Sequence, residues 1–490
     1  MVQVVITRAK ASLCAMQVDG WLERAAATRP AHPALVTPEG VLSYEQLHAD
    51  ARAAAAELEG FGAGTGARIG IALPAGLDFA RALHACLLLG AAAVPVDLRL
   101  SEPERDAVAS RCDVVLAEPV PLAGATRGFV SGGGAGRSGA RSRHDLDASA
   151  LVMHTSGTSA APKPVELTYG NLLWSSLGSA VALGAPDDER WLCVLPLSHM
   201  GGLSILVRSA IYATTALVHE RFELDRALDA LQRQRVSVVS LVATTLERLL
   251  VAGLERVEGL RCVLLGGGPA GAALLERARA AGVPVALTYG LTETCSQVAT
   301  TPVAALGGDG REDGPGDGTG DGRASPAQPT RRAVPPLFCT QVRIAPDEEI
   351  LVRGPTVAPG ALAPDGWLHT GDLGALDGAG RLSVLGRRAE TIISGGENVA
   401  PAEVESVLES HPLVLEAGVY GVEDPQWGEA VSAVVVLRRP GDGDGTESVE
   451  ELRAHCARSL APYKVPKRIS LSPAPLPRTR SGKLLRRELG

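Results

Sequence analysis

A segment rich in small and hydroxyl residues combines features that suit the binding of an anion. Residues 153–163 read M-H-T-S-G-T-S-A-A-P-K and follow an apolar stretch that predicts a strand over Leu151–Thr155. Backbone N–H groups and hydroxyls in such a loop can close on a phosphate, and Lys163 supplies positive charge. The spacing G-x-x-x-x-G-K-[ST] is absent, so this is not a Walker A loop. The alternative is an ordinary turn.

Lysine and asparagine are both rare in this chain. The sequence has 42 Arg but only five Lys, and its two Asn are Asn171 and Asn398. Lysine is a compact charge and arginine a planar fork, so they do not replace each other at a tight site. We therefore expect the surviving Lys and Asn residues to lie where their chemistry is needed. The alternative is that their positions carry no meaning.

A second segment places a carboxylate just after a predicted strand. Val285–Tyr289 is apolar, and residues 289–294 read Y-G-L-T-E-T. Open α/β sheets bind ligands at the carboxyl ends of their strands. Glu293 could hold Mg²⁺ there beside a triphosphate. The alternative is a helix that begins with Thr292 as its N-cap and has an acidic first turn.

Three further segments carry charged or amide side chains in loops. Residues 367–372 read W-L-H-T-G-D and are followed by G-R-R-A-E at 386–390; an Asp and an Arg can together hold ribose hydroxyls. A hairpin turn with surface charges is the alternative. Residues 394–398 read S-G-G-E-N, and residues 480–484 read R-S-G-K-L. A basic stretch of the last kind is more often simply solvated.

Composition excludes several classes of protein. The 490 residues suffice for about three domains, or one large and one small domain, and 46% hydrophobic with 21% charged residues indicates a globular chain. The net charge of −8 argues against a nucleic-acid partner. The nearly apolar run Ala82–Val96 is shorter than the roughly 20 residues of a membrane span, and we find no secretory signal. The eight cysteines form no C-x-x-C pair, so zinc and disulfide frameworks are not expected. We expect a reduced, cytoplasmic protein, and a homo-oligomer is compatible with the sequence.

Predicted strands and helices alternate through most of the chain, which favours an α/β fold with largely parallel sheets. Ser43-Tyr-Glu-Gln46 is typical of a capping box that begins a helix ending near Leu58. The other predicted helices here are Leu77–Gly90, Leu224–Arg235 and Ala270–Ala281. The other predicted strands are Arg68–Leu73, Ala92–Val96, Trp191–Pro196, Ala213–His219, Ser237–Ala243 and Arg261–Leu265.

The pattern changes in the last quarter of the chain. Helix Ala402–Ser410, strands Glu416–Tyr420 and Ala430–Arg438 and helix Ser448–Leu460 predict a compact α+β unit. We place a domain boundary near 387–390, which separates residues 1–386 from 387–490. The segments 131–143, 306–333 and 440–446 are rich in Gly with Ser, Asp or Pro, and this composition indicates flexible insertions.

In order and spacing, the five chemical segments resemble the adenylate-forming superfamily, which includes acyl-CoA synthetases, peptide-synthetase adenylation domains and firefly luciferase. The resemblance runs from about Trp21 to Leu489. It implies a large N-terminal AMP-binding domain of mixed and parallel sheets with flanking helices, over residues 1–386. It also implies a small, mobile α+β C-terminal domain over residues 387–490. ATP, Mg²⁺ and coenzyme A would be the co-substrates, and a small-molecule carboxylic acid would be activated.

The resemblance also implies a role for each segment. Thr292 would contact the α-phosphate, Glu293 would hold Mg²⁺, and Asp372 and Arg387 would bind the ribose. The phosphates of ATP would lie against Thr155, Ser156, Gly157, Thr158, Ser159 and Lys163, and the adenine pocket would be lined by Gly266, Gly267, Gly268, Tyr289 and Gly290.

The remaining assignments concern the predicted small domain. Lys483 would bridge the carboxylate and the α-phosphate, and Ala389 would be the hinge. Gly395, Gly396, Glu397 and Asn398 would face the acceptor thiol. Such an enzyme first makes an acyl-adenylate and then lets the thiol displace AMP, two steps that suit a mobile domain.

The chain departs from the usual family pattern at several positions. Ser159 and Ala160 replace the more common T-G of the phosphate loop, and Ala160 adds a methyl group where glycine allows positive φ. Ala389 replaces the usual Asp or Lys of the hinge, and Glu390 stands where Asp is commoner. A weakly active nucleotide-binding homologue therefore stays open as an interpretation.

Four strings resemble the o-succinylbenzoate–CoA ligases of menaquinone biosynthesis within that superfamily. They are P-V-E-L-T-Y-G-N at 164–171, L-P-L-S-H-M-G-G-L-S at 195–204, T-E-T-C-S-Q at 292–297 and I-I-S-G-G-E-N at 392–398. His199 would then sit where the acyl pocket meets the thiol tunnel, unless it is a core histidine. A CoA ligase for another aromatic or fatty acid is also compatible with the sequence, and so is a stand-alone carrier-loading adenylation enzyme.

The insertion at 306–333 generates the first testable prediction. Its Gly-, Asp- and Pro-rich composition cannot bury apolar area, and loop length costs little entropy. Replacing residues 307–332 with a short Gly/Ser linker should leave the melting temperature and the turnover close to those of the wild type. A turnover several-fold lower would mean that the segment belongs to the site.

Overall fold

The structure is a computed structural model that describes residues 16–120, 143–155, 163–306, 333–394, 397–424, 427–438, 446–479 and 484–490. Several predicted site residues lie outside these ranges: Ser156, Gly157, Thr158, Ser159, Gly395, Gly396 and Lys483. The predicted insertion at 306–333 lies outside them except for its two end residues, and so do residues 131–142 and 440–445.

An eight-stranded sheet forms the centre of the N-terminal part, with the strand order β15-β14-β13-β12-β10-β11-β2-β3. Its six central strands are parallel, and β3 and β15 are antiparallel at the two edges. The bounds are β2 Pro33–Thr37, β3 Gly40–Ser43, β10 Arg190–Cys193, β11 Thr215–Val218, β12 Val238–Leu241, β13 Cys262–Leu265, β14 Val285–Tyr289 and β15 Ala299–Thr300. The predicted strands in this region are confirmed.

A second sheet has the order β6-β4-β5-β8-β9, with only β9 antiparallel. Its bounds are β4 Arg68–Ile71, β5 Ala92–Pro95, β6 Val114–Leu116, β8 Ser149–Thr155 and β9 Lys163–Thr168, and a separate pair joins β1 Gln17–Asp19 to β7 Arg143–Asp145. The main hydrophobic core is shared by both sheets, because it contains Ile69 and Leu151 of one sheet and Trp191 of the other, with Leu172 and Leu203 on helices.

The helices of the N-terminal part follow the strands in the predicted alternation. Their bounds are α1 Trp21–Thr28, α2 Tyr44–Gly60, α3 Leu77–Leu89, α4 Glu102–Ala109, α5 Tyr169–Leu183, α6 Met200–Tyr212, α7 Leu224–Arg233, α8 Ala243–Val251 and α9 Ala272–Ala280. None of the helices in the described part of the chain is long and apolar enough to cross a membrane.

A four-stranded antiparallel sheet comes next, in the order β16-β17-β18-β19. Its strands are β16 Gln341–Ile344, β17 Glu349–Arg353, β18 Leu368–Leu376 and β19 Leu382–Arg387. The backbone N–H of Ala358 donates to the carbonyl of Glu293 at 2.8 Å, so this region contacts the segment that follows β14.

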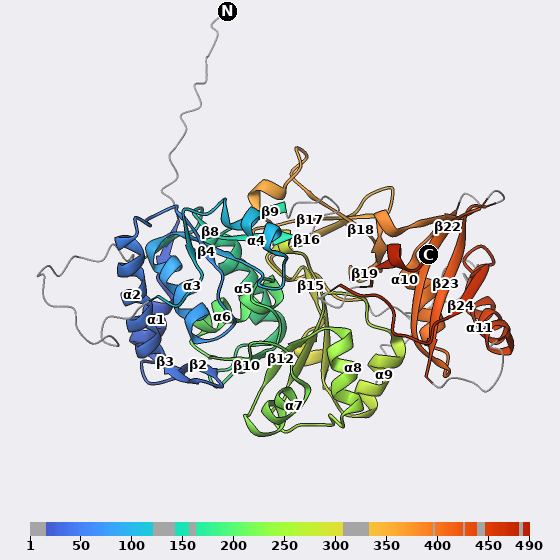
Figure 1. Ribbon diagram of the computed structural model, residues 1–490, viewed down its shortest axis with the longest axis horizontal. Helices are drawn as coiled ribbons and strands as arrows, with labels where there is room; N and C mark the ends of the chain where they lie inside the picture. Colours follow the sequence, from blue (N-terminus) through green and yellow to red (C-terminus); the bar gives the residue numbers. More distant parts are fainter. Residues whose placement is uncertain are drawn as a thin grey trace, which may run out of the picture.

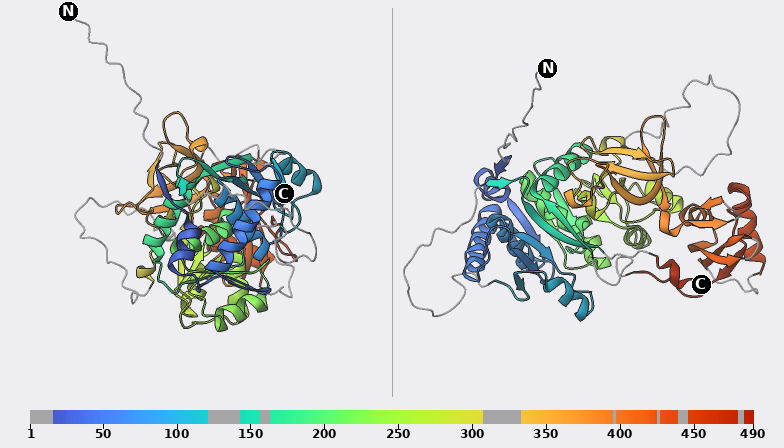
Figure 2. Two further views of the ribbon diagram at one scale, coloured as in Figure 1. Left: turned by 90° about the vertical axis from the view of Figure 1, so that its left-hand side faces the viewer. Right: turned by 90° about the horizontal axis from the view of Figure 1, so that it is seen from above.

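The C-terminal part has its own sheet and its own core. The strands are β20 Ile392–Ser394, β21 Glu397–Val399, β22 Val414–Asp424, β23 Gly428–Leu437 and β24 Arg468–Leu471, and the helices are α10 Pro401–Glu409 and α11 Thr446–Ser459. Val404, Val419, Val435 and Leu452 pack together inside it. It lies at one end of the long axis, opposite α1 and α2 (Figures 1 and 2). The predicted α/β fold, with a large part followed by a small α+β part, is confirmed.

The rare residues Asn171, Lys464 and Lys467 have structural roles, so our expectation that rarity marks chemistry is wrong for them. Asn171 closes a capping box with Thr168 at the start of α5. Its amide also donates to the carbonyls of Pro355 at 2.8 Å and Val357 at 3.0 Å. Lys464 is ion-paired with Glu403 and Lys467 lies over the Trp427 ring. Their partners come from distant elements, which a count of residue types cannot reveal.

The seven cysteines of the described ranges are free. Several lie in the core, and burial raises the pKa of Cys86 and of Cys193 to about 12. These thiols are therefore protonated and unreactive at neutral pH.

Asn171 allows a test of how the four-stranded sheet is attached to the rest of the N-terminal part. Asn171→Ala should lower the free energy of unfolding by on the order of 2 kcal/mol, because it removes a cap and leaves two carbonyls without donors. The measurement is urea unfolding followed by tryptophan fluorescence. Gln46→Ala is the matched control, because Gln46 closes an exposed capping box on α2 and should cost about 1 kcal/mol or less. Equal losses would contradict the tertiary role of Asn171.

Candidate active site

Three of the predicted segments emerge at the same edge of the eight-stranded sheet. Residues 266–268 follow β13, residues 290–294 follow β14, and His199 lies after β10. Because these strands are parallel, their carboxyl ends meet at one edge, which is where open α/β sheets bind ligands.

Glycine is required in the two turns at this edge. A Cβ on Gly290 would lie 1.5 Å from the carbonyl oxygen of Ser296, and one on Gly266 would lie 2.7 Å from Cγ2 of Thr288. Cys295 and Ser296 have φ values of 54° and 97°, which side-chain-bearing residues rarely adopt. The backbone after β14 is therefore folded tightly on itself, and such strain is concentrated at functional sites.

Tyr289, Asp372 and Arg387 form one hydrogen-bonded cluster. The Tyr289 hydroxyl donates to Oδ2 of Asp372 at 2.7 Å, and Nε of Arg387 lies 2.7 Å from Oδ1. Burial, and then the charge of Asp372, raise the pKa of Tyr289 above its usual range. Asp372 and Arg387 face each other in β18 and β19, so they lie within strands rather than in a turn. Asp372 is buried while Arg387 is half-exposed, which leaves a polar rim for a ligand.

The ends of the predicted phosphate loop lie at the open end of a hairpin. Thr155 ends β8 and is paired with Lys163, which begins β9. The Thr155 hydroxyl donates to the carbonyl of Lys163 at 3.4 Å. Thr155 is also at the carboxyl end of β8, whose neighbour β5 runs parallel to it.

Glu293 lies in a short 3₁₀ turn, Thr292–Thr294, directly after β14. The N-cap of this turn is Leu291, so the alternative in which Thr292 caps a helix is wrong. No three His, Cys, Asp or Glu side chains of the described residues gather as a metal site. A single carboxylate is compatible with Mg²⁺, which is usually bound by one or two carboxylates together with substrate phosphates and water.

His199 is at the N-cap position of α6, and its side chain is 46% exposed. The alternative of a core histidine is therefore wrong. Its Nε2 lies 3.0 Å from a guanidinium nitrogen of Arg99. His199 lies in the loop after β10 of the eight-stranded sheet, and Arg99 lies in the loop after β5 of the five-stranded sheet.

The residues predicted in the C-terminal part lie on its hairpin. Glu397 and Asn398 are in β21, where they pair with Ser394 and Ile393 of β20. Ala389 is in a short 3₁₀ turn, Arg388–Glu390, between β19 and β20.

Arg208 is a candidate that our sequence analysis missed. It lies on α6, is 1% exposed, and donates to the hydroxyl of Ser175 at 3.2 Å. Its guanidinium lies 5.6 Å from the centre of the Trp191 ring, and its Nε has no hydrogen-bond partner. No described Asp or Glu forms an ion pair with it. A buried charge without a counter-charge is costly, so Arg208 is a candidate binding residue for an anionic group. The available signal was a lone charged residue in the otherwise uncharged helix Met200–Tyr212.

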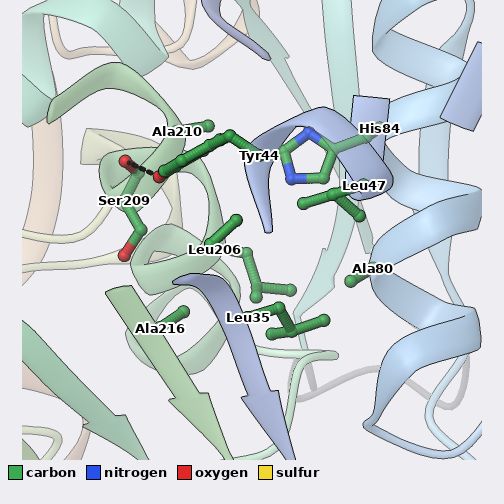
Figure 3. Close-up of a pocket in the computed structure, with 10 residues that line it drawn as sticks. Leu35, Tyr44, Leu47, Ala80, His84, Leu206, Ser209, Ala210 and Ala216 are labelled. Atoms are coloured by element: carbon green, nitrogen blue, oxygen red, sulfur yellow. Dashed lines mark hydrogen bonds between the residues drawn. The ribbon is translucent and has the colours of Figure 1, made fainter. Parts of the chain in front are cut away.

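Two cavities are lined by other residues. Figure 3 shows one of about 10 Å³ between β2, α2, α3 and α6, which is room for one water molecule. There the Tyr44 hydroxyl donates to the carbonyl of Ser209, and burial lowers the pKa of His84 to about 4. The other cavity, of about 450 Å³, lies beside β2, β11 and α7. Neither is lined by a predicted site residue.

Comparison with known proteins gives two family matches and several similar relatives. Residues 22–362 match the AMP-binding enzyme family, and residues 403–483 match the AMP-binding enzyme C-terminal domain. The 2-succinylbenzoate–CoA ligase of Bacillus licheniformis is 37% identical, over 97% of this chain and 100% of the relative.

Two solved structures of the o-succinylbenzoate CoA synthetase of Bacillus subtilis have the same fold. The complex with the acyl-adenylate intermediate is 34% identical, covers 97% of this chain and 98% of its own, and has a TM-score of 0.79. The complex with ATP and magnesium ion has the same identity and TM-score, over 97% and 100% of the two chains. With both family models matched and relatives similar over nearly the whole length, the chain belongs to the AMP-binding enzyme family.

Proposed function

We propose that the chain is an ATP-dependent 2-succinylbenzoate–CoA ligase that acts in two steps. In the first, a carboxylate oxygen attacks the α-phosphorus of ATP, and pyrophosphate leaves with the electrons of the broken P–O bond. In the second, the sulfur of coenzyme A attacks the acyl carbon, the thiol proton is released, and AMP leaves. The similarity of the whole chain to 2-succinylbenzoate–CoA ligases supports both steps.

The nucleotide would bind along the carboxyl edge of the eight-stranded sheet. Asp372 and Arg387 present a carboxylate and a guanidinium that match ribose hydroxyls, and Tyr289 fixes the orientation of the carboxylate. The glycines after β13 and β14 allow a flat base to approach the backbone. Thr155 and Lys163 border the loop that would hold the phosphates. Glu293 would hold Mg²⁺, which neutralises phosphate charge when it is bound.

The choice of acid rests on Arg208. 2-Succinylbenzoate has two carboxylates, and only one of them is activated, so the other stays charged in the acyl pocket. Arg208 is buried, lacks a carboxylate partner among the described residues, and lies on α6, the helix that begins directly after His199. A monoacid would leave this guanidinium unpaired, whereas a diacid supplies its counter-charge. Arg208 therefore favours a diacid over benzoate or a fatty acid.

Thioester formation tests this choice. The enzyme should convert 2-succinylbenzoate in preference to benzoate, to a medium-chain fatty acid and to the two monoacid analogues that lack either carboxylate. Arg208→Leu should reduce kcat/KM for 2-succinylbenzoate by a factor of about 10² or more, the usual effect of removing one partner of a buried charge pair. The same substitution should reduce kcat/KM far less for the monoacid analogue that keeps the activated carboxylate. The ratio of the two kcat/KM values, which is the preference for the diacid, should therefore fall.

The preference is the ratio of two kcat/KM values measured on the same variant. Partial unfolding lowers both values equally, so it does not change the ratio. Arg208→Lys keeps the charge and should retain part of the preference. A wild type that prefers a monoacid, or an Arg208→Leu variant that retains the full preference for the diacid, would contradict the proposal.

We further propose that Ala389 is the pivot between two domains, residues 1–386 and 387–490. Arg388 is ion-paired with Asp347 of the β16–β17 region at 2.8 Å, whereas Glu390 is ion-paired with Arg486 in the C-terminal part. Ala389 therefore lies between one residue that is ion-paired to the N-terminal part and another that is ion-paired within the C-terminal part. Rotation there would bring Lys483 to the nucleotide for adenylation and residues 395–398 for the thiol step.

Two variants should have opposite effects on the half-reactions. Lys483→Ala should slow pyrophosphate release by a factor of about 10² or more, because it removes a charge contact to the reacting groups, and should still convert supplied acyl-adenylate to thioester. Ala389→Pro fixes φ and should make acyl-adenylate in a single burst, while thioester formation slows by at least about tenfold. Single-turnover assays of each half-reaction distinguish them. Equal losses in both steps for both variants would contradict the domain assignment.

A cytoplasmic location and a homo-oligomeric state stay predictions, which cell fractionation and sedimentation velocity would test.

A further inference from the structure

The loops after two different sheets meet through three charged or titratable side chains. Asp97 and Arg99 follow β5 of the five-stranded sheet, and His199 follows β10 of the eight-stranded sheet. Arg99 contacts both other residues, so it links the carboxyl edges of the two sheets. This link is beside the start of α6 and separate from the Tyr289–Asp372–Arg387 cluster.

Asp97 holds the guanidinium of Arg99 in a fixed orientation. Nε of Arg99 donates to Oδ1 at 2.8 Å and a terminal nitrogen donates to Oδ2 at 2.6 Å, so the pair is bidentate. The backbone N–H of Arg99 donates to Oδ1 at 3.0 Å, and Ser198 adds a side-chain hydrogen bond. Burial alone would raise the pKa of Asp97, but these hydrogen bonds outweigh it and lower the pKa to about 2. The carboxylate is therefore charged at any working pH.

The contact between Arg99 and His199 determines where the imidazole proton lies. A guanidinium can only donate, so Nε2 of His199 must accept its hydrogen bond, over 3.0 Å. A neutral ring that accepts at Nε2 carries its proton on Nδ1. The carboxylate Oδ2 of Asp97 is 3.9 Å from Nε2 and makes no hydrogen bond to it at that distance.

The charges around His199 favour its neutral form. Partial burial of the ring and then the positive charge of Arg99 lower its pKa, and the negative charge of Asp97 opposes them. The ring is therefore neutral at neutral pH, and it becomes charged only when the pH falls below a pKa that is lower than 6.5. A protonated ring would carry a hydrogen on Nε2 and repel Arg99.

We propose that Asp97 and Arg99 are positioning residues that keep His199 neutral with its proton on Nδ1. In this state Nε2 accepts a hydrogen bond from Arg99, and Nδ1 carries the proton, so neither ring nitrogen has a lone pair available to accept another proton. His199 can therefore donate a hydrogen bond to an oxygen of the acyl group, and it does not take the proton from the thiol. The part of this inference that concerns the thiol step rests on the proposed function, whereas the state of the ring does not.

The state of the ring is measured without any substrate. ¹⁵N-labelled histidine spectra, with His199→Gln used for assignment, should show Nδ1 protonated and Nε2 unprotonated above the titration midpoint, and a midpoint below 6.5. Arg99→Gln should move the midpoint to higher pH, because the positive charge is lost while Asp97 remains. Arg99→Lys should keep the midpoint near that of the wild type, because the charge is retained.

Asp97→Asn tests the positioning role separately from the charge of Arg99. Without the bidentate carboxylate, Arg99 is no longer held on Nε2, so the spectra should shift toward the Nε2–H form that a free imidazole ring prefers. Arg221→Gln is the matched control, because Arg221 lies after the neighbouring strand β11, is largely exposed and is ion-paired with Glu223. It removes the same charge and should leave the His199 spectrum unchanged.

The thiol step gives the second readout. Thioester formation from supplied acyl-adenylate should fall as the pH is lowered through the pKa of His199, and in Arg99→Gln this fall should begin at higher pH. At pH 6 this variant should be slower than the wild type in the thiol step, and its loss there should exceed its loss in pyrophosphate release.

Two results would overturn the inference: a ring of His199 protonated on Nε2 in the wild type, or an unchanged midpoint and pH profile in Arg99→Gln. A substrate other than 2-succinylbenzoate would contradict the proposed function and leave the spectroscopic result intact.

Discussion

The parallel arrangement of the six central strands is the constraint on which the site depends. Crossovers connect β10, β11, β12, β13 and β14 in turn, so the carboxyl ends of these parallel strands lie at the same edge and the turns toward the crossover helices begin there. Residues 266–268, 290–294 and His199 are far apart in the chain but follow β13, β14 and β10 at this one edge. The antiparallel four-stranded sheet then brings Asp372 and Arg387 to Tyr289, at the end of β14. Strand direction therefore brings these candidate site residues together.

Buried charged side chains fall into two groups. Those with an ion-pair partner support the fold, whereas one without a partner is a candidate for binding a ligand. Several buried ionic groups of the described residues have an ion-pair partner: Arg486 with Glu405, Arg261 with Glu189, and Asp372 with Arg387. Arg208 is the exception in this comparison, since hydroxyl and aromatic contacts alone do not offset the loss of its hydration. The same reasoning makes a ligand with a second carboxylate a better match than a purely apolar acid.

Hydrogen bonds that connect separate elements give the site its rigidity. Asn171 of α5 holds the carbonyls of Pro355 and Val357, and Ala358 donates to the carbonyl of Glu293. Arg99 joins the edges of the two sheets beside His199. The contacts of Asn171 involve buried or half-buried groups, where an unmade hydrogen bond is costly, so the elements that they join cannot slide past each other cheaply. The C-terminal part has a hydrophobic core of its own.

Local patterns alone determined much of this protein. The capping box at Ser43 and the apolar runs of β10 to β14 were predicted at or near their observed positions, because caps and buried strands depend on neighbouring residues. The segments around Thr155, Glu293, Asp372 and Arg387 were recognised from residue type and order. Tertiary structure alone decided that Tyr289 bonds Asp372, 83 residues away, and that Arg99 bonds His199, 100 residues away. It also decided that Arg208 is buried without a carboxylate partner among the described residues and that Asn171 is structural. The physical reason is that these properties depend on which elements pack together, and neither periodicity nor composition contains the distances between elements remote in the chain.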